Sequence, residues 1–159
     1  ELPPDFHSLR IYRSKKGILV RDGHPVIEAY EKAGVMTWEL LNRWPAVCVT
    51  AGMKDGGAKS VEGRRVGVVL PYFLTVPYVV ARTDFTFEGP LITLRRFMMD
   101  SQFQFRILPM PEESGPFEPR LVWHHCSHTD PFLQWVRGLV VDAARSEARL
   151  LGVIDTSEE

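Results

Sequence analysis

Histidine, cysteine and acidic side chains, the residue types that bind transition metals, gather in one short stretch of the sequence. Between Trp123 and Asp130 the chain reads Trp-His-His-Cys-Ser-His-Thr-Asp. Imidazole and thiolate groups are good zinc ligands, but structural zinc sites draw paired ligands from two separated segments. The sequence holds no second cysteine or histidine pair to complete a tetrahedron, so we predict no metal site and expect no cofactor.

A glycine-rich segment at residues 51–57 has the sequence AGMKDGG. Such a backbone suits a loop that approaches a ligand closely, and it also suits an ordinary surface loop. It is not a phosphate-binding P-loop, because the Gly-Lys-Ser/Thr ending is absent. The sequence also lacks a Gly-x-Ser-x-Gly elbow and any motif that marks a nucleophile with its base and orienting acid. We therefore expect a protein that is not an enzyme.

The two cysteines, Cys48 and Cys126, lie in apolar or aromatic settings. They are too few and too far apart in sequence for a disulfide framework. We expect both to be buried free thiols.

The charge balance argues against direct binding of nucleic acid. The chain has 19 Lys and Arg against 20 Asp and Glu, a net charge of -1. Duplex binding needs a concentrated positive face, and the pairs Arg64-Arg65 and Arg95-Arg96 are isolated and typical of solvated strand or helix ends. We do not expect this chain alone to contact DNA.

Composition favours a soluble globular protein in the cytoplasm. The chain is 45% hydrophobic and 25% charged, which is ordinary for soluble domains. No apolar run approaches the roughly 20 residues that span a bilayer, so we expect no membrane contact. The N-terminal sequence ELPPDFHSLR has neither the basic start nor the apolar core of a secretion signal.

The elements that must position any site alternate between strands and helices, which predicts an α/β fold. Residues 9–21 are predicted to form one long strand, bent near Gly17, that could pass between two lobes and ends in the turn at residues 22–25. Thr37 is a predicted N-cap for a helix over residues 38–42. Thr75 is a predicted N-cap for a second helix that runs to about residue 82, with Pro77 in its first turn. The remaining predicted strands are residues 46–50, 64–70, 85–88, 105–108 and 120–124.

Two further helices are predicted from their apolar faces. Gly89-Pro90 begins the first, which would bury Leu91, Leu94, Phe97 and Met98. Residues 109–119 contain four prolines and are predicted to form an extended connector. Asp130-Pro131 then begins the last helix with a capping side chain and a proline in the first turn. Its predicted face toward the sheet consists of Phe132, Trp135, Val136, Leu139, Val140 and Ala143.

Four segments in order resemble the effector-binding domain of LysR-type transcriptional regulators. They are residues 11–25 (IYRSKKGILVRDGHP), residues 64–85 (RRVGVVLPYFLTVPYVVARTDF), the helix that begins at Gly89-Pro90, and residues 121–139 (LVWHHCSHTDPFLQWVRGL). The first is similar to the family's strand with a basic residue, Gly and His-Pro. The second is similar to its strand, Pro-aromatic-Phe-Leu helix start and Thr-Asp turn. The last is similar to its Trp-His strand and Asp-Pro helix.

The resemblance implies a fold like the type 2 periplasmic-binding proteins, with two Rossmann-like lobes of which one is incomplete. Residues 20–112 would form a complete lobe, and residues 1–19 with 113–159 would be the remainder of the other. A small organic acid, aromatic in one branch of the family, would bind in the interlobe cleft. Promoter DNA would be bound through a helix-turn-helix that this chain lacks, and the regulator would be a homo-oligomer. A solute-binding protein of a transporter, which shares the lobe architecture, is the alternative.

Candidate effector-binding residues follow two of the predicted strands, because open α/β sheets bind ligands beyond the carboxyl ends of their strands. After the strand at residues 46–50 these residues are Thr50, Ala51, Gly52 and Asp55. After the strand at residues 64–70 they are Tyr72, which could donate a hydrogen bond to an acid, and Phe73, which could stack on a ring. The alternatives are that Tyr72 caps a helix and that Phe73 belongs to the core.

Overall fold

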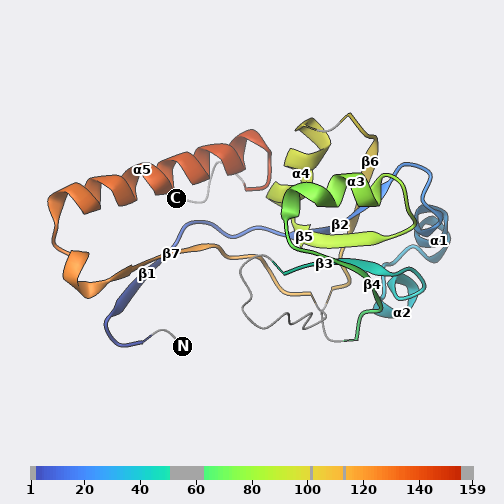
Figure 1. The fold of residues 1–159 in the computed structure, drawn as a ribbon, viewed down its shortest axis with the longest axis horizontal. Helices are drawn as coiled ribbons and strands as arrows, with labels where there is room; N and C mark the ends of the chain where they lie inside the picture. Colours follow the sequence, from blue (N-terminus) through green and yellow to red (C-terminus); the bar gives the residue numbers. More distant parts are fainter. Residues whose placement is uncertain (1–2, 51–62, 101, 113, 155–159) are drawn as a thin grey trace. The chain divides into compact units, whose positions relative to one another are not determined.

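The computed structural model describes residues 3–50, 63–100, 102–112 and 114–154 (Figure 1). The chain divides into two compact units, one comprising residues 16–115 and the other comprising residues 1–15 with 116–159. Both units combine strands with helices, which confirms the α/β prediction. The predicted lobe bounds, 20–112 against 1–19 with 113–159, stay a prediction.

The unit at residues 16–115 is built on a mixed five-stranded sheet with the order β4-β3-β5-β2-β6 (Figure 1). Its strands are β2 (Lys16–Arg21), β3 (Ala46–Val49), β4 (Val66–Leu70), β5 (Thr86–Pro90) and β6 (Phe105–Pro109). β3 is parallel to both β4 and β5, whereas β2 is antiparallel to β5 and β6. The carboxyl ends of β3, β4 and β5 therefore lie at one edge of the sheet.

Helices cover both faces of this sheet. α1 (Pro25–Ala33) and α2 (Trp38–Leu41) pack through Val26, Leu40 and Leu41 on one face. On the other face, α3 (Val76–Val80) and α4 (Leu91–Asp100) pack through Val76, Val80, Leu94 and Phe97. The central strand β2 is consequently buried on both sides, and its residues Ile18, Leu19 and Val20 are all inaccessible to solvent. A strand with both faces covered is apolar at successive positions instead of alternate ones.

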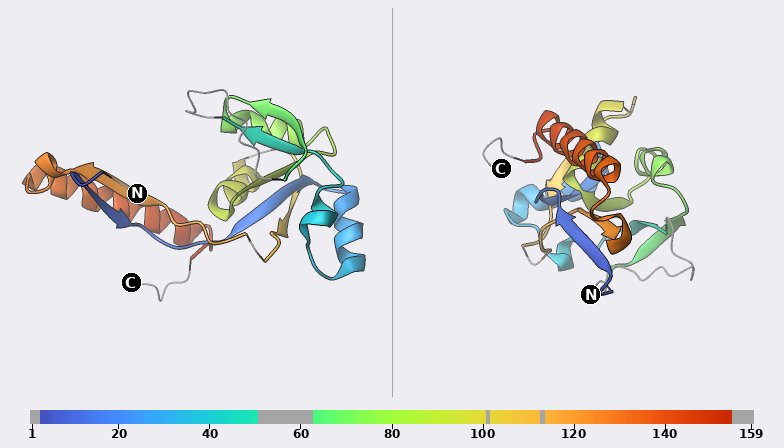
Figure 2. Two further views of the ribbon diagram at one scale, coloured as in Figure 1. Left: turned by 90° about the horizontal axis from the view of Figure 1, so that it is seen from below. Right: turned by 90° about the vertical axis from the view of Figure 1, so that its left-hand side faces the viewer.

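The second unit is smaller. β1 (Phe6–Arg10) and β7 (Arg120–His124) form an antiparallel two-stranded sheet, and the short 3-10 turn η2 (His125–Ser127) leads to α5 (Pro131–Leu150). Figure 2 shows α5 alongside the two strands. The Asp130 carboxylate accepts hydrogen bonds from the backbone N–H groups of Phe132 and Leu133, and Pro131 occupies the first turn. The predicted cap and proline start of this helix are confirmed.

The prediction of one strand over residues 9–21 is wrong. β1 ends at Arg10 and β2 begins at Lys16, because the two strands belong to different sheets. Between them, Ser14 makes only an isolated bridge with Phe117. Gly17 is not a bend but lies inside β2, where a Cβ atom would come within 2.9 Å of the Ile107 side chain. The glycine therefore permits close packing of neighbouring strands.

Two helix starts differ from the prediction. α1 was not predicted, because histidine is not among the usual N-caps, yet His24 Nδ1 accepts a hydrogen bond from the Val26 backbone N–H. Thr75 does not cap α3. Its backbone is helical, since the 3-10 turn η1 (Phe73–Thr75) runs directly into α3, and its hydroxyl donates to the Tyr72 carbonyl instead. The cap of α2 by Thr37 and the place of Pro77 in the first turn of α3 are confirmed.

Several burial predictions are wrong. Met98 is exposed, Cys48 is half-buried and Cys126 is exposed. Most of the predicted sheet-facing side of α5 is also exposed, including Phe132 and Trp135, and the residues this helix buries are Val141 and Ala148. The physical reason is that α5 has more than one apolar side, while a two-stranded sheet is too narrow to cover them all.

Candidate functional site

The predicted effector site depends on two strand ends that lie side by side. β3 and β4 are parallel neighbours, and Val49 is paired with Leu70 at their carboxyl ends. The Thr50 backbone N–H donates a 3.0 Å hydrogen bond to the Leu70 carbonyl, so the two chains leave the sheet together. Thr50 and the Pro71-Tyr72-Phe73 segment consequently occupy one edge of one sheet, which is the arrangement that a shared site requires.

The side chains at this edge differ in how they are held. Tyr72 is 69% exposed and makes no side-chain cap to the turn that follows it. Phe73 is 43% exposed and packs edge-on against Phe87, with 6.2 Å between ring centroids. Thr50 is half-buried. Tyr72 occupies the N-cap position of η1 without a side-chain hydrogen bond, and Phe73 lies at the margin of the core with part of its ring accessible.

Three other predicted site residues, Ala51, Gly52 and Asp55, lie outside the described residues. Their role in binding stays a prediction. Within the part of the chain that the structure describes, the candidate site therefore consists of Thr50, Tyr72 and Phe73.

A basic residue that the sequence reasoning missed starts at the same edge. Lys16 is paired with Pro90, the last residue of β5, because β2 runs antiparallel to β5. Strands in a sheet are about 4.8 Å apart, and β2 lies two strands from β3, so the Lys16 backbone is about 10 Å from that of Thr50. Its side chain is half-buried. The sequence alone could not place Lys16 at this edge, because its position depends on how β2 pairs across the sheet.

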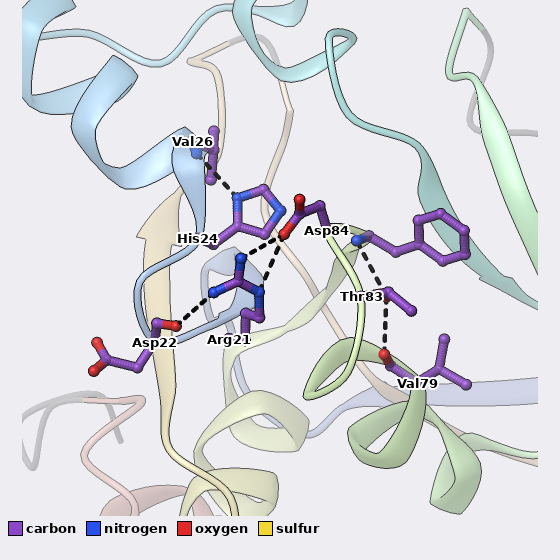
Figure 3. Close-up of polar contacts among 8 residues, drawn as sticks. Arg21, Asp22, His24, Val26, Val79, Thr83 and Asp84 are labelled. Atoms are coloured by element: carbon purple, nitrogen blue, oxygen red, sulfur yellow. Dashed lines mark hydrogen bonds and ion pairs between the residues drawn. The ribbon is translucent and has the colours of Figure 1, made fainter.

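The residues that carry the family resemblance come together elsewhere, at the opposite end of β2 and β5. Figure 3 shows Arg21 and His24 pointing toward Asp84. Two guanidinium nitrogens of Arg21 donate to one Asp84 oxygen, over 2.7 and 3.1 Å. The buried His24 caps α1, and burial lowers its pKa, although the nearby Asp84 opposes that shift. A neutral imidazole is the form that accepts from Val26.

Thr83 completes this polar cluster. Its hydroxyl donates to the Val79 carbonyl over 2.8 Å and accepts from the Phe85 N–H over 3.2 Å (Figure 3). The Thr-Asp pair therefore ends α3 and positions the start of β5, while Arg21 and His24 attach the same point to β2 and α1. These contacts stabilise the fold, and the cluster lies far from the candidate effector edge.

A buried ion pair lies beneath α2. Arg64 was predicted to be a solvated strand end, but its side chain is only 1% exposed and pairs with Glu88, which is 8% exposed. The guanidinium also donates to Asn42 Oδ1 and to Thr86 Oγ1, each over 2.7 Å. Burial raises the pKa of Glu88, and the Arg64 charge opposes that rise. This network holds the amino ends of β4 and β5 to the end of α2.

The histidine-rich stretch forms a stacked cluster in the smaller unit. His7 on β1 shares a hydrogen bond with His125, with 2.9 Å between Nε2 and Nδ1, and its ring stacks on His128 at 4.0 Å. The Trp123 indole donates to His128 Nδ1, and the Arg137 guanidinium lies 4.9 Å from the Trp123 ring centre. Among the described residues, no group of three or more His, Cys, Asp or Glu side chains is arranged to hold a metal ion.

A shallow depression of about 420 Å³ lies between α1 and α2. Its lining combines apolar and charged residues, namely Pro25, Glu28, Ala29, Lys32, Ala33, Leu40 and Arg43. It shares no residue with the carboxyl-end edge. In the described parts of the chain, no helix is long and apolar enough to cross a membrane.

Comparison with known proteins finds sequence similarity to transcriptional regulators. No family model matches the sequence. It is 26% identical over 152 residues to the HTH-type transcriptional regulator SyrM 1 of Sinorhizobium fredii. That alignment covers 91% of this chain and 43% of the regulator, so the chain spans less than half the length of the relative.

Two solved structures have a similar fold. One is the regulatory domain of MetR from N. meningitidis, a LysR family regulator, with a TM-score of 0.66 and 11% identity over the whole of this chain and 72% of that one. The other is the effector-binding domain of QuiR in complex with shikimate, with a TM-score of 0.62 and 10% identity over 90% of this chain and 67% of that one. At these identities the likeness shows the fold, which confirms the predicted resemblance to type 2 periplasmic-binding proteins and LysR-type regulatory domains.

Proposed function

Because the chain has the fold of the regulatory domain of LysR-type transcriptional regulators, we propose that it is the effector-sensing part of such a regulator. The observation that carries this proposal is the meeting of Thr50 with Tyr72 and Phe73 at the carboxyl ends of two parallel strands, joined by the hydrogen bond from the Thr50 N–H to the Leu70 carbonyl. Ligands of open α/β sheets bind at such edges.

The side chains at this edge suit a small organic acid with an apolar or aromatic part. The exposed Tyr72 hydroxyl is a hydrogen-bond donor for a carboxylate. The Lys16 side chain starts two strands away from Thr50, so its ammonium group is within reach of the far end of a ligand about 6 to 8 Å long. The accessible part of the Phe73 ring offers a surface on which an apolar group can pack. The shikimate bound to QuiR is an acid of this size class.

The regulatory output would come from parts that the chain does not contain. A relative of this chain, SyrM 1, is named for a helix-turn-helix, and we propose that promoter DNA is bound through that module in a homo-oligomer that acts in the cytoplasm. Effector binding would shift the balance between conformations of the regulator and so change how the DNA-binding parts sit on a promoter. The name of this relative favours a regulator over a transporter's solute-binding protein and over an enzyme.

Calorimetric titration with benzoate and shikimate at millimolar concentration tests the binding site. We expect saturable binding, weakened about tenfold in Tyr72→Phe, since one hydrogen bond to a charged group is worth ~1.5 kcal/mol. Tyr78→Phe is the matched control: Tyr78 is 58% exposed on α3 and its ring packs on Phe103, so that variant should bind as the parent does. Equal weakening in both variants, or no saturable binding of either acid, would refute the assignment of the site.

A further inference from the structure

Three histidines and one tryptophan in the smaller unit bring their rings together. His7 and Trp123 are opposite each other in the register of β1 and β7, and their rings stack with 5.7 Å between centroids. His128 stacks on His7, and its plane is only 3° from that of Trp123. His125 also stacks on His7, with 5.2 Å between centroids. We call His7, Trp123, His125 and His128 the His-Trp cluster.

The hydrogen bonds of this cluster limit the number of protons that it can hold. The Trp123 indole is a donor only, so His128 Nδ1, which lies 3.2 Å away, accepts and carries no proton. His7 Nε2 and His125 Nδ1 are 2.9 Å apart, and this contact is a hydrogen bond only if one of the two nitrogens lacks a proton. At least two of the three imidazoles are therefore neutral whenever both contacts are intact.

The charge that contacts the cluster is positive. The Arg137 guanidinium lies over the Trp123 ring and donates to the His128 carbonyl. Among the described residues, no carboxylate forms a hydrogen bond or an ion pair with the three imidazoles: Asp5 contributes only its backbone carbonyl, and the Asp130 carboxylate caps α5. Each proton that the cluster takes up therefore adds positive charge beside a fixed positive charge.

We propose that the His-Trp cluster is a pH-sensitive switch, which is closed at neutral pH and opens below about pH 6. Opening exchanges the contact between His7 and His125, and that between Trp123 and His128, for contacts with water. The segment that it releases is residues 125–128, which joins β7 to α5. The lowered pKa of His7, caused by desolvation and then by the charges of His128, His125 and Arg137, agrees with this direction.

This switch goes beyond effector sensing and does not rest on it. All four residues of the cluster belong to the unit formed by residues 1–15 and 116–159, whereas the candidate effector edge belongs to residues 16–115. The two proposals can therefore fail separately.

The proton count sets the steepness of the switch. Relative to three neutral imidazoles, the closed cluster holds at most one additional proton, whereas the open cluster can hold three. Opening in acid therefore takes up two protons or more. By linkage, the equilibrium constant for opening changes about a hundredfold per pH unit when two protons are taken up, against about tenfold for one. The cluster can thus respond to a smaller change in pH than a single histidine can.

His124 provides a matched control beside the cluster. It follows Trp123 in β7, so its side chain lies on the opposite face of the strand, where it packs edge-on against Phe6. Its Nδ1 caps η2 by accepting from the Cys126 N–H over 3.1 Å. His124→Asn keeps a capping acceptor and removes an imidazole that lies outside the cluster. This variant should retain the steep pH response of the parent.

Two-dimensional ¹H–¹⁵N NMR of the complete 159-residue chain, between about pH 8 and pH 5, tests the proposal. The indole signal of Trp123 is identified as the one that is missing from Trp123→Phe. We expect this signal to shift as the hydrogen bond to His128 is lost, with a pH dependence steeper than the uptake of one proton. The signals of Trp38 and Trp135, which lie outside the cluster, should stay in place.

His125→Gln tests the proton count. It removes one of the three imidazoles and leaves an amide that can still form a hydrogen bond with His7. Opening should then take up one proton fewer, so its equilibrium constant should change only about tenfold per pH unit. His7→Gln should have the same effect, and it replaces the first variant if His125→Gln alters the spectrum of the chain at neutral pH.

Three results would overturn the proposal. A Trp123 indole signal that stays in place over this pH range would mean that the contacts survive protonation. A transition that is unchanged in His125→Gln, or abolished in His124→Asn, would assign the titration to other groups. Simultaneous loss of the signals from residues 16–115 would mean acid unfolding of the whole chain in place of a local opening. Benzoate titration near neutral pH is the independent readout, because the cluster variants should bind benzoate as the parent does if the candidate effector site is correct.

Discussion

Removing Arg64 should destabilise the chain far more than removing its neighbour Arg65. The Arg64 side chain is only 1% exposed, and it is the charged partner of Glu88 beneath α2. Arg65 is adjacent in sequence but exposed. The two substitutions to alanine therefore remove the same side chain from two environments, one inside the protein and one in water.

The expected difference follows from the burial of both charges. Deleting one member of a buried pair leaves the other charge uncompensated, which costs about 3 to 5 kcal/mol, whereas a surface substitution stays within about 0.5 kcal/mol. Arg64→Ala would also remove the hydrogen bonds to Asn42 and Thr86. Because the total free energy of unfolding of a domain is only about 5 to 15 kcal/mol, Arg64→Ala should consume a large part of it.

The loss should depend on pH. Burial already raises the pKa of Glu88 above its ordinary 4.5, and the Arg64 charge is what limits the rise. Without Arg64 the pKa of Glu88 rises further. A carboxyl group with a raised pKa in the folded state contributes stability below its unfolded pKa and loses it as the pH increases through its folded pKa. Arg64→Ala should therefore be least destabilised near pH 4.5 and progressively more so toward neutral pH.

Urea unfolding of the parent, Arg64→Ala and Arg65→Ala at several pH values measures this difference. The double variant Arg64→Met with Glu88→Leu should recover much of the lost stability, because apolar residues can replace a buried ion pair at little net cost. The reasoning fails if Arg64→Ala and Arg65→Ala unfold at the same urea concentration, or if their difference does not change with pH.

Three further outcomes follow from local contacts. His24→Ala should lower the free energy of unfolding by about 1 to 2 kcal/mol through loss of the α1 cap, and His24→Asn should lose less in the same urea titration. Asp130→Ala should cost about 1 kcal/mol and reduce the helical circular dichroism of α5, whereas Asp130→Ser should preserve it. The pKa of His7 is lowered, by desolvation and then by the charges of His128, His125 and Arg137, so the stability that it supports should be lost as the pH falls below 6.5. His7→Gln should flatten that pH dependence in thermal unfolding, and an unchanged profile would contradict a role for this ring.

Local signals predicted the elements that are specified locally. Thr37 and Asp130 are common N-capping residues, and both cap helices as expected. The candidate site combines residues that follow two different predicted strands. These strands, β3 and β4, are parallel neighbours in the sheet, and this pairing brings Thr50 next to Leu70. His24 escaped notice because histidine is not among the usual N-capping residues, although its ring nitrogen accepts the hydrogen bond that caps α1.

The failures share a physical cause, which is that burial is decided by tertiary partners. Arg64 meets Glu88 only because β5 is inserted beside β3, and a pair of arginines in sequence gives no sign of it. The helical period of α5 identifies apolar positions but cannot say which of its sides meets the sheet. In the same way, Lys16 reaches the candidate effector edge only through the antiparallel pairing of β2 with β5.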